Sequence, residues 1–325
     1  MKLLILKMLE ENMHEFTSGE VIAKKFGMTR ANVWKNIQKL INDGYKIESV
    51  SNKGYHLVDY NTNISKSRIS TLTNNKVTIE YLESVDSTNN YAKEIVKDSD
   101  ISNHIVISDQ QTMGKGRNGR SFYSPSKNGI YMSFILRPQL TLLDTQLLTI
   151  AAAVAVVESI KELYEVDTDI KWLNDIYYQN KKLCGILTEG EIILESNSYR
   201  YVIVGIGLNV FNDQNLPKEL QNIYSSLDTI FKGKIDRNIL VATIINNFYE
   251  LYNNLLENKT FILEKYRNSS IVLDKYITIN NDLNKKYLVI DIDDYGHLIV
   301  KDESDEIITL NSGDVSIKGD FNNEH

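Results

Sequence analysis

The sequence at residues 114–120 reads Gly114-Lys115-Gly116-Arg117-Asn118-Gly119-Arg120, in which three glycines are interspersed with three cations. Glycine lets the backbone approach a ligand closely, and it is costly to order because the unfolded chain has so much freedom there. Lysine and arginine carry charge suited to phosphate. The stretch therefore predicts a loop that closes over an anion, although a solvated surface loop has the same composition.

The glycine spacing also matches the dinucleotide-binding pattern G-x-G-x-x-G, but the residues that follow exclude that interpretation. The pattern requires a helix directly after the glycines and an acidic residue about 20 positions later. Here the turn-forming residues 124–129 follow, and then the apolar stretch 130–136, which is typical of a buried strand. A protein kinase is excluded as well, because the sequence contains no V-A-I-K or H-R-D segment.

Length and composition bound the remaining classes. A chain of 325 residues with 42% hydrophobic residues predicts two or three domains with real cores. The longest apolar run, residues 150–157, is shorter than the roughly 18 residues of a membrane span, and early lysines exclude a signal peptide. The single cysteine, Cys184, excludes an internal disulfide and fits a reducing compartment. We therefore expect a cytoplasmic protein that does not bind membranes.

Charge and histidine content restrict binding partners. Five scattered histidines and one cysteine offer no zinc-ligand spacing. The net charge of −7 argues against nucleic-acid binding by the whole chain, but it leaves room for one basic module.

Residues 1–58 predict such a module. Apolar spacing indicates three helices, of which the second is capped by the Thr17-Ser18-Gly19-Glu20 segment and the third by Thr29. Asp43-Gly44 is expected to end the third helix, and two short strands, 45–50 and 55–58, follow it. Helix, turn, helix and β-hairpin make a winged helix-turn-helix.

The charge of this module predicts DNA binding. Between Lys24 and Lys46 there are six cations and one acid, which is the electrostatic footprint of a nucleic-acid interface. A winged helix used only for protein contacts is the alternative. Trp34 is expected to serve packing or backbone contact. The candidate DNA-binding residues lie near the start of the third helix and in the wing: Arg30, Asn32, Lys35, Asn36 and Lys53.

The polar stretch 61–70 is expected to be a linker, and an α+β domain with a mixed sheet is expected to follow it. Strands are predicted at 77–82, 105–108, 130–136, 170–172, 183–187 and 201–210, and helices at 91–96, 142–163 and 238–256. A polar turn is expected between the strands that begin at Ile170 and Leu183. After residue 267, five short strands separated by Asn-, Asp- and Gly-rich turns predict a small β-barrel.

Five segments occur once each, in this order along the chain: Asp86-Ser87-Thr88-Asn89, Gln111 with the glycine loop, Lys171-Trp172-Leu173-Asn174-Asp175, Lys182 to Leu187, and Gly205 to Asn209. This set closely resembles the biotin protein ligases. With the winged helix in front, including its wing at residues 53–57, it resembles the bifunctional ligases that also repress the biotin operon. The resemblance covers essentially the whole chain and implies three domains: residues 1–62 (DNA-binding), 63–268 (ligase) and 269–325 (SH3-like barrel).

The resemblance implies two chemical steps. The biotin carboxylate attacks the α-phosphate of ATP, giving biotinyl-5′-AMP and pyrophosphate. A lysine of an acceptor, a biotin carboxyl carrier protein or domain, then attacks the mixed anhydride and releases AMP. Such chemistry needs charge stabilisation and orientation rather than an enzyme nucleophile.

The resemblance also assigns roles to residues. Arg117 and Arg120 are expected to meet the phosphates, and Phe122, where the family usually has tryptophan, to cover the adenine. Asp175 would orient the acceptor amine or help to hold Mg²⁺. The expected catalytic residues are Lys182, Arg117 and Asp175. The expected biotin-binding residues are Ser87, Thr88, Asn89, Gln111, Gly114, Lys115, Gly116, Arg117, Lys182 and Gly185. The expected nucleotide-binding residues are Arg117, Arg120, Phe122, Asn174 and Asn209.

Several residues have a plainer interpretation. Ser87 and Thr88 are also good helix caps, and Lys181 competes with Lys182 for the catalytic role. Trp172 is expected in the core and Cys184 to be a buried small hydrophobe.

Two positions depart from the family pattern. Lys115 stands where the family carries arginine, which keeps the charge but loses the bidentate fork. Leu173 replaces the usual proline and removes a fixed φ. Two other functions stay open at this point: a lipoate-attaching ligase, and a transcription factor whose ligase domain only senses. We further expect the adenylate to order residues 114–128 and to favour a homodimer that binds a two-fold operator.

Overall fold

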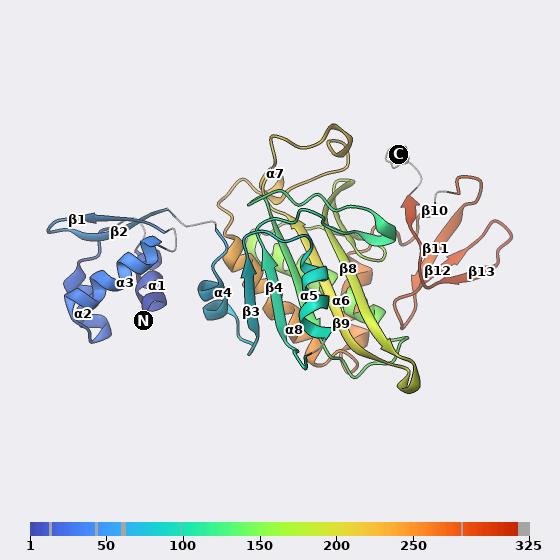
Figure 1. The fold of residues 1–325 in the computed structure, drawn as a ribbon. Coiled ribbons are helices and arrows are strands. Elements are labelled where there is room, and N and C mark those ends of the chain that lie inside the picture. The colour runs from blue at the N-terminus through green and yellow to red at the C-terminus, as the bar shows by residue number, and fades with distance from the viewer. Residues whose placement is uncertain (13–14, 43–44, 60–62, 98, 281, 318–325) are drawn as a thin grey trace. The chain divides into compact units, whose positions relative to one another are not determined.

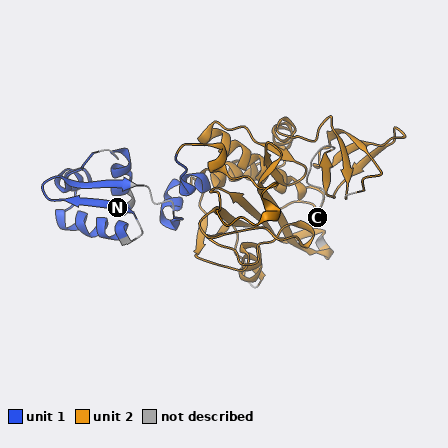
Figure 2. Ribbon diagram, turned by 90° about the horizontal axis from the view of Figure 1, so that it is seen from above, with its two compact units in different colours: residues 1–72, 234–242 blue, residues 73–233, 243–325 orange. Residues whose placement is uncertain are grey.

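The computed structural model describes the chain except for residues 13–14, 43–44, 60–62, 98, 281 and 318–325. The chain divides into two compact units (Figure 2). Unit 1 comprises residues 1–72 and 234–242, and unit 2 comprises residues 73–233 and 243–325. Helix α8 (Arg237–Asn253) therefore begins in unit 1 and continues in unit 2.

The first part of unit 1 is the predicted winged helix-turn-helix (Figure 1). Two of its helix starts follow the expected caps: Ser18 Oγ accepts a hydrogen bond from the Val21 N–H at 3.1 Å, and Thr29 Oγ1 accepts one from the Asn32 N–H at 3.2 Å. The expected stop at Asp43-Gly44 lies outside the described residues. The elements are α1 (Lys2–Glu11), α2 (Gly19–Phe26), α3 (Arg30–Asn42), and the antiparallel strands β1 (Lys46–Val50) and β2 (Gly54–Asp59).

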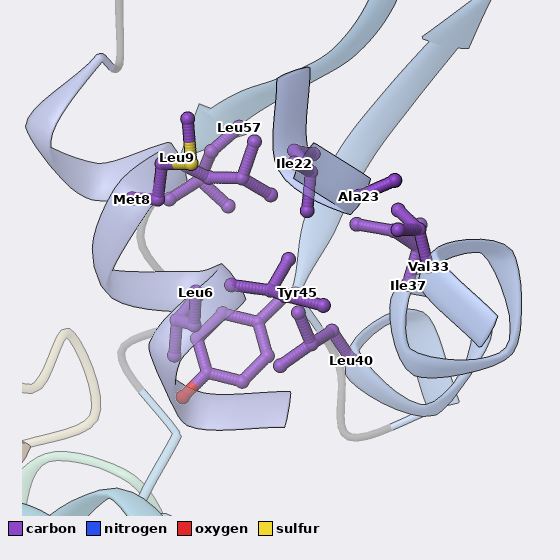
Figure 3. Packing of buried hydrophobic residues seen from close by; sticks show 11 residues of the cluster. Leu6, Met8, Leu9, Ile22, Ala23, Val33, Ile37, Leu40, Tyr45 and Leu57 are labelled. Atoms are coloured by element: carbon purple, nitrogen blue, oxygen red, sulfur yellow. The ribbon is translucent and has the colours of Figure 1, made fainter. Parts of the chain in front are cut away.

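One apolar cluster joins these elements. Figure 3 shows side chains from α1, α2, α3 and β2 converging around Tyr45. Val33, Ile37 and Leu40 are fully buried, as the helical spacing predicts. Trp34 was expected to pack in the core or to contact the DNA backbone. It does not pack in this core, because 54% of its surface is exposed.

The polar stretch that we expected to be a linker contains a helix, α4 (Lys66–Leu72). Arg68 of this helix is only 4% exposed and forms ion pairs with Glu10 Oε1 at 2.8 Å and with Asp236 Oδ2 at 2.7 Å. Burial raises the pKa of Glu10, and Arg68 opposes that shift. The stretch contributes Arg68 to a buried ion cluster, and polar composition alone does not distinguish such a segment from a solvated linker.

Unit 2 is built on a sheet that is mixed, as predicted, and that has seven strands in the order β3-β4-β5-β9-β8-β7-β6. Strands β3 and β4 are parallel, and the other neighbours are antiparallel. The strands are β3 (Thr78–Leu82), β4 (His104–Ser108), β5 (Gly129–Leu136), β6 (Asp169–Lys171), β7 (Asp175–Tyr178), β8 (Lys181–Ile193) and β9 (Ser198–Asn209). The helices are α5 (Thr88–Lys97), α6 (Gln146–Tyr164), α7 (Leu227–Ile230), α8 and α9 (Lys259–Asn268).

Helices cover both faces of this sheet (Figure 1). On β5, the Ser133 hydroxyl contacts Asn89 of α5, whereas the neighbouring Phe134 ring packs on Phe248 of α8. Successive side chains of a strand point to opposite faces, so α5 and α8 lie on opposite sides. Thr149 of α6 bonds to Thr188 of β8 at 2.7 Å, whereas the next residue on β8, Glu189, bonds to Asn89. Of α5, α6 and α8, only α5 therefore lies on this face of the sheet, and α6 and α8 lie on the other face.

Three elements of unit 2, β7, α7 and α9, were missed in the sequence, in addition to α4. The polar turn expected between 172 and 183 holds β7, and α9 was not anticipated. Strand β7 is polar on one side because Asp175 faces a cavity, and this obscures the strand pattern. The peptide bond between Trp172 and Leu173 is cis.

The C-terminal part of unit 2 contains the five predicted strands. They form one antiparallel sheet in the order β13-β12-β11-β10-β14. The strands are β10 (Tyr276–Ile279), β11 (Tyr287–Ile292), β12 (Leu298–Lys301), β13 (Ile307–Leu310) and β14 (Val315–Ile317). The turn before β14 brings Asp314 to the glycine loop of the larger sheet, where it pairs with Arg120 at 2.8 Å.

Candidate functional site

A cavity in unit 2 gathers side chains from all five sequence motifs. Its walls come from the start of α5, the glycine loop, the β6–β7 region, β8, β9 and the turn before β14. The residues that line it are Ser87, Thr88, Asn89, Gln111, Lys115, Gly116, Arg117, Arg120, Ser121, Phe122, Asn174, Asp175, Lys182, Gly185, Ile186, Leu187, Gly205, Ile206, Gly207 and Asp314.

Three glycines form the floor of this cavity. Gly185 of β8 pairs with Gly207 of β9 in the sheet register, and Gly205 lies two residues away on the same face. A Cβ at Gly205 would lie 2.2 Å from Asn89 Oδ1, and one at Gly207 would lie 2.5 Å from the Phe122 ring. The absence of side chains is therefore what allows α5 and the loop to approach the sheet.

The start of α5 places polar groups at one end of the cavity. Ser87 Oγ accepts a long hydrogen bond of 3.5 Å from the Asn90 N–H, so this hydroxyl also has the capping role that the sequence allowed. The Thr88 N–H donates to Gln111 Oε1 at 2.9 Å, and the Thr88 hydroxyl oxygen lies 3.1 Å from the same atom. Gln111 Nε2 donates to Ser124 Oγ at 2.9 Å. The Gln111 amide is therefore fixed in one orientation.

The Asn89 amide is held entirely by protein groups. Its Nδ2 donates to the Leu187 carbonyl at 3.2 Å and to Glu189 Oε2 at 2.8 Å, and its Oδ1 lies 2.6 Å from Ser133 Oγ. Ser133 and Glu189 were not found by sequence reasoning. The available signal was a lone polar residue, Ser133, inside the apolar stretch 130–136, because a fully buried hydroxyl needs a partner.

Two of the expected cations, Lys182 and Arg117, lie on the side of the cavity formed by β7 and β8. Lys182 Nζ pairs with Asp175 Oδ1 at 2.8 Å and lies 6.0 Å from the centroid of the Phe122 ring. Arg117 donates to Asn174 Oδ1 at 3.1 Å. Lys181, the competing lysine, is exposed, donates to the Gln221 carbonyl at 3.3 Å, and does not line the cavity. The geometry therefore favours Lys182 over Lys181.

The glycine loop is closed by its own backbone. The Gly116 N–H donates to the Arg120 carbonyl at 2.7 Å, and the Phe122 N–H donates to the Gly114 carbonyl at 2.8 Å. Lys115 Nζ donates to Asn90 Oδ1 at 2.8 Å, next to the start of α5. All three loop cations line the cavity, although Lys115 and Arg120 are also exposed to solvent.

A larger cavity adjoins the first and shares Gln111, Arg117, Arg120, Ser121, Phe122, Asn174, Asp175, Lys182 and Asp314 with it. Gly114 and Asn209 line only this second cavity. Asn209 Nδ2 donates to the Ser225 carbonyl at 3.1 Å and to the Lys182 carbonyl at 3.4 Å, so it also fixes the backbone beside Lys182. The arrangement offers two compartments with cations and the Phe122 ring at their junction.

Two residues expected in the core are confirmed there. Cys184 is fully buried, and that burial raises the pKa of its thiol far above its ordinary value, so the thiol stays protonated at neutral pH. Trp172 is 3% exposed, and its Nε1 donates to the Gly296 carbonyl at 2.9 Å. Cys184 is therefore not arranged as a nucleophile, and Trp172, although buried, also lines the second cavity.

Over the residues that the structure describes, there is no cluster of three or more His, Cys, Asp or Glu side chains that could hold a metal ion alone. The cavity carboxylates are Asp175 and Asp314, and each is paired with a cation. In the same part of the chain, no helix is long and apolar enough to cross a membrane.

The candidate DNA-binding residues lie on the surface of unit 1. Arg30, Asn32 and Lys35 are exposed along the first turns of α3, and Lys53 is exposed in the turn between β1 and β2. Asn36 is half-buried, and its Nδ2 donates to the Asn32 carbonyl at 2.7 Å. Lys53 Nζ lies 5.7 Å from the Phe16 ring centroid. Helix and wing thus present cations as the module predicts.

Three models of known protein families match segments of this chain. The HTH domain matches residues 2–56, the Biotin/lipoate A/B protein ligase family matches residues 81–209, and the Biotin protein ligase C terminal domain matches residues 273–318.

Whole proteins and solved structures of biotin protein ligases are also similar to this chain. The bifunctional ligase/repressor BirA of Bacillus subtilis is 38% identical over 78% of this chain and 78% of that protein. The BirA of Salmonella typhimurium is 30% identical over 71% of each. The structure of the biotin protein ligase from Aquifex aeolicus in complex with biotin and ATP superposes with a TM-score of 0.61, at 28% identity, over 74% of this chain and 98% of that one.

Proposed function

Because the chain belongs to the family of bifunctional biotin protein ligases and repressors, we propose that it activates biotin with ATP and transfers it to a lysine of an acceptor protein. The acceptor is a biotin carboxyl carrier protein or domain. The same chain binds operator DNA through its winged helix and represses transcription in response to biotin.

The reaction needs no nucleophile from the enzyme. A biotin carboxylate oxygen attacks the α-phosphorus of ATP, the bond to the β-phosphate oxygen breaks, and pyrophosphate leaves. The acceptor amine, after losing a proton, then attacks the acyl carbon, and AMP leaves with the electrons of the acyl–oxygen bond. Both steps build negative charge on phosphate oxygens, which fixed cations stabilise.

The layout of the cavity supports the residue roles that the family resemblance implies. Thr88 and Gln111 bind the ureido head of biotin at the polar end, over the glycine floor. Lys182 then lies between the biotin carboxylate and the α-phosphate, and Arg117 reaches the phosphates. Phe122 lines both compartments and covers the adenine in the second one, where Asn209 lies.

Asp175 has the role of orienting the acceptor amine. It is half-buried and is paired with Lys182. Since Mg²⁺ in nucleotide sites is held by one or two carboxylates together with phosphates and water, the few carboxylates at this cavity fit that ion, and Asp175 would contribute to holding it. Bound there, Mg²⁺ would neutralise phosphate charge.

The proposed domains are residues 1–62, which bind DNA, residues 63–268, which carry the ligase activity, and residues 269–325, which form the C-terminal SH3-like domain. We propose that the adenylate favours a homodimer, which presents two winged helices to a two-fold operator.

The single observation that carries the function is the convergence of Lys182, Arg117 and Asp175 on a cavity that Thr88 and Gln111 also line. Charge for phosphate and polar groups for a ureido ring lie on one glycine floor. A site that only senses biotin has no need for this arrangement of cations.

The test incubates the protein with ATP, Mg²⁺, an acceptor domain and either biotin or lipoate. We expect pyrophosphate release and labelling of the acceptor lysine with biotin only. Labelling by lipoate would make the chain a lipoate ligase. Adenylate-independent biotin binding with neither product would make the ligase domain a sensor.

A further inference from the structure

The Tyr123 hydroxyl and the Asp213 carboxylate join two parts of the chain that are distant in sequence, and we call this hydrogen bond the latch. We propose that the latch holds together two walls of the second cavity, and so sets how long the adenylate stays bound there. The inference rests on the proposed function. It makes Asp213 a positioning residue, because Asp213 itself is not among the residues that line either cavity.

One of these walls is the segment that connects β9 to α7, residues 211–225, which we call the connecting segment. The other wall follows the glycine loop, where the neighbouring residues Phe122 and Tyr123 both line the second cavity. In the proposed function this cavity holds the adenine, so both walls border the nucleotide half of the adenylate. The residues of the connecting segment that line the cavity are Pro217, Glu219, Leu220, Ile223 and Tyr224.

The ends of the connecting segment are held by backbone hydrogen bonds. At its start, the Phe211 N–H donates to the Asn128 carbonyl at 2.7 Å. At its end, the Ser225 N–H donates to the Lys182 carbonyl at 2.9 Å, and the Lys182 N–H donates to the Ile223 carbonyl at 2.6 Å. These bonds are independent of the latch, so its loss loosens the middle of the segment and leaves Lys182 in place.

The latch is a short, charge-assisted hydrogen bond. The Tyr123 hydroxyl donates to Asp213 Oδ2 at 2.6 Å, which is typical of an O–H···O⁻ bond. Burial and this bond raise the pKa of Tyr123 to about 12, and the same bond lowers the pKa of Asp213. The phenol is therefore protonated and the carboxylate ionised at neutral pH. The Asn215 N–H donates to Asp213 Oδ1 at 2.9 Å and so orients the carboxylate.

The latch is separate from the bonds that hold the reacting cations. Lys182 is paired with Asp175, and Arg117 donates to Asn174. Without the latch the two walls should separate more often, which opens a way out for the adenylate, whereas the cations stay where the chemistry needs them. Loss of the latch should therefore speed release of the adenylate much more than it changes the rate at which the adenylate forms.

The test uses the full chain and measures both rates. Labelled biotinyl-AMP is formed on the protein, and its release is followed after a chase with unlabelled biotinyl-AMP. Formation is followed as the burst of pyrophosphate in the first turnover at saturating biotin and ATP. We expect Tyr123→Phe, which keeps the ring and removes the hydroxyl, to speed release about fivefold, the effect of one hydrogen bond partly exposed to water. The rate of formation should change far less.

A double-mutant cycle separates the latch from a direct contact between the Tyr123 hydroxyl and the ligand. Asp213→Ala removes the acceptor and should speed release about as much as Tyr123→Phe. The combined variant should release the adenylate no faster than either single variant, because both substitutions break the same bond. If Asp213→Ala does not fold, Asp213→Asn serves instead, with a smaller increase because its oxygen accepts without charge. Additive effects of the two substitutions would overturn the latch.

Tyr91→Phe is the matched control. The Tyr91 hydroxyl also donates to a carboxylate, Glu80 Oε1 at 2.7 Å, and Tyr91 is not among the residues that line either cavity. Release should be unchanged in this variant, and an equal increase there would show general loosening instead of a latch. Release at the wild-type rate in folded Tyr123→Phe protein would also overturn the latch while leaving the ligase intact. Failure of wild-type protein to form the adenylate at all would instead overturn the proposed function.

Discussion

The cations of the winged helix and the cations of the ligase cavity are held in opposite ways. Arg30 and Lys35 are exposed along α3, and among the described residues no hydrogen bond or ion pair of their side chains is found. Lys182 and Arg117 are half-buried and bonded to Asp175 and Asn174. An exposed cationic surface of this kind attracts DNA over long range and in a salt-sensitive way, whereas specific bonds to neighbouring side chains hold the cations of the cavity. Removing a charge should consequently cost far more in the cavity than on the helix.

The largest expected effect is in the cavity. Lys182→Ala should lower the adenylation rate about 10³-fold, or about 4 kcal/mol, because a fixed transition-state contact is lost. Pyrophosphate release measures it, and thermal unfolding should show an intact fold. Lys181→Ala removes the exposed neighbouring lysine and serves as the control. A Lys182→Ala protein that releases pyrophosphate at the wild-type rate would remove Lys182 from the mechanism.

The next effect concerns stability within unit 1. Arg68→Ala leaves the acids Glu10 and Asp236 together without their shared cation. Breaking a buried ion pair from one side costs about 3 kcal/mol where its partners are partly exposed. Urea unfolding followed at Trp34 in unit 1 should report this loss, whereas Arg200→Ala, at an exposed pair with Glu191, should change little. Equal stability of both variants would show that the cluster contributes nothing net.

A smaller effect is expected on the DNA surface. Arg30→Ala and Lys35→Ala should each weaken operator binding about tenfold and reduce the slope of log affinity against log salt by about 0.9, if each neutralises one phosphate. Biotinylation should not change. Lys232→Ala, an exposed lysine of unit 2, is the control. Salt slopes that match wild type would place both residues outside the interface and would favour a winged helix used for protein contacts.

The smallest effect sharpens the comparison inside the glycine loop. Lys115 bonds to Asn90 through a single ammonium donor. An arginine could hold Asn90 and a phosphate oxygen at once through its fork. Lys115→Arg should slow dissociation of biotinyl-AMP a few-fold in a ligand-chase measurement. Dissociation that is unchanged or faster would show that charge alone matters at this position.

Sequence patterns gave the winged helix, the mixed sheet and the C-terminal strands, because apolar periodicity reports burial on one face. They failed at α4 and β7, where a buried ion cluster and a cavity-facing Asp175 replace apolar residues. The cations and glycines of the cavity stand out in the sequence by charge or by a missing side chain, whereas Thr88, Gln111 and Phe122 were assigned only through the family resemblance. Ser133 and Glu189 were not found, because their importance lies in contacts between β5, β8 and α5 that are distant in sequence.

In the coupling that we propose, the adenylate made in the cavity controls DNA binding by the winged helix. The most direct measurement is footprinting of a two-fold DNA site, selected from random sequence, at fixed salt, with protein alone, with biotin, with ATP and with both, while sedimentation reports the dimer. Biotin with ATP should tighten binding on the order of tenfold or more, in the usual range of allosteric coupling, and should raise the dimer fraction in parallel. Equally tight binding without ligand, or tightening with no dimer, would contradict the account.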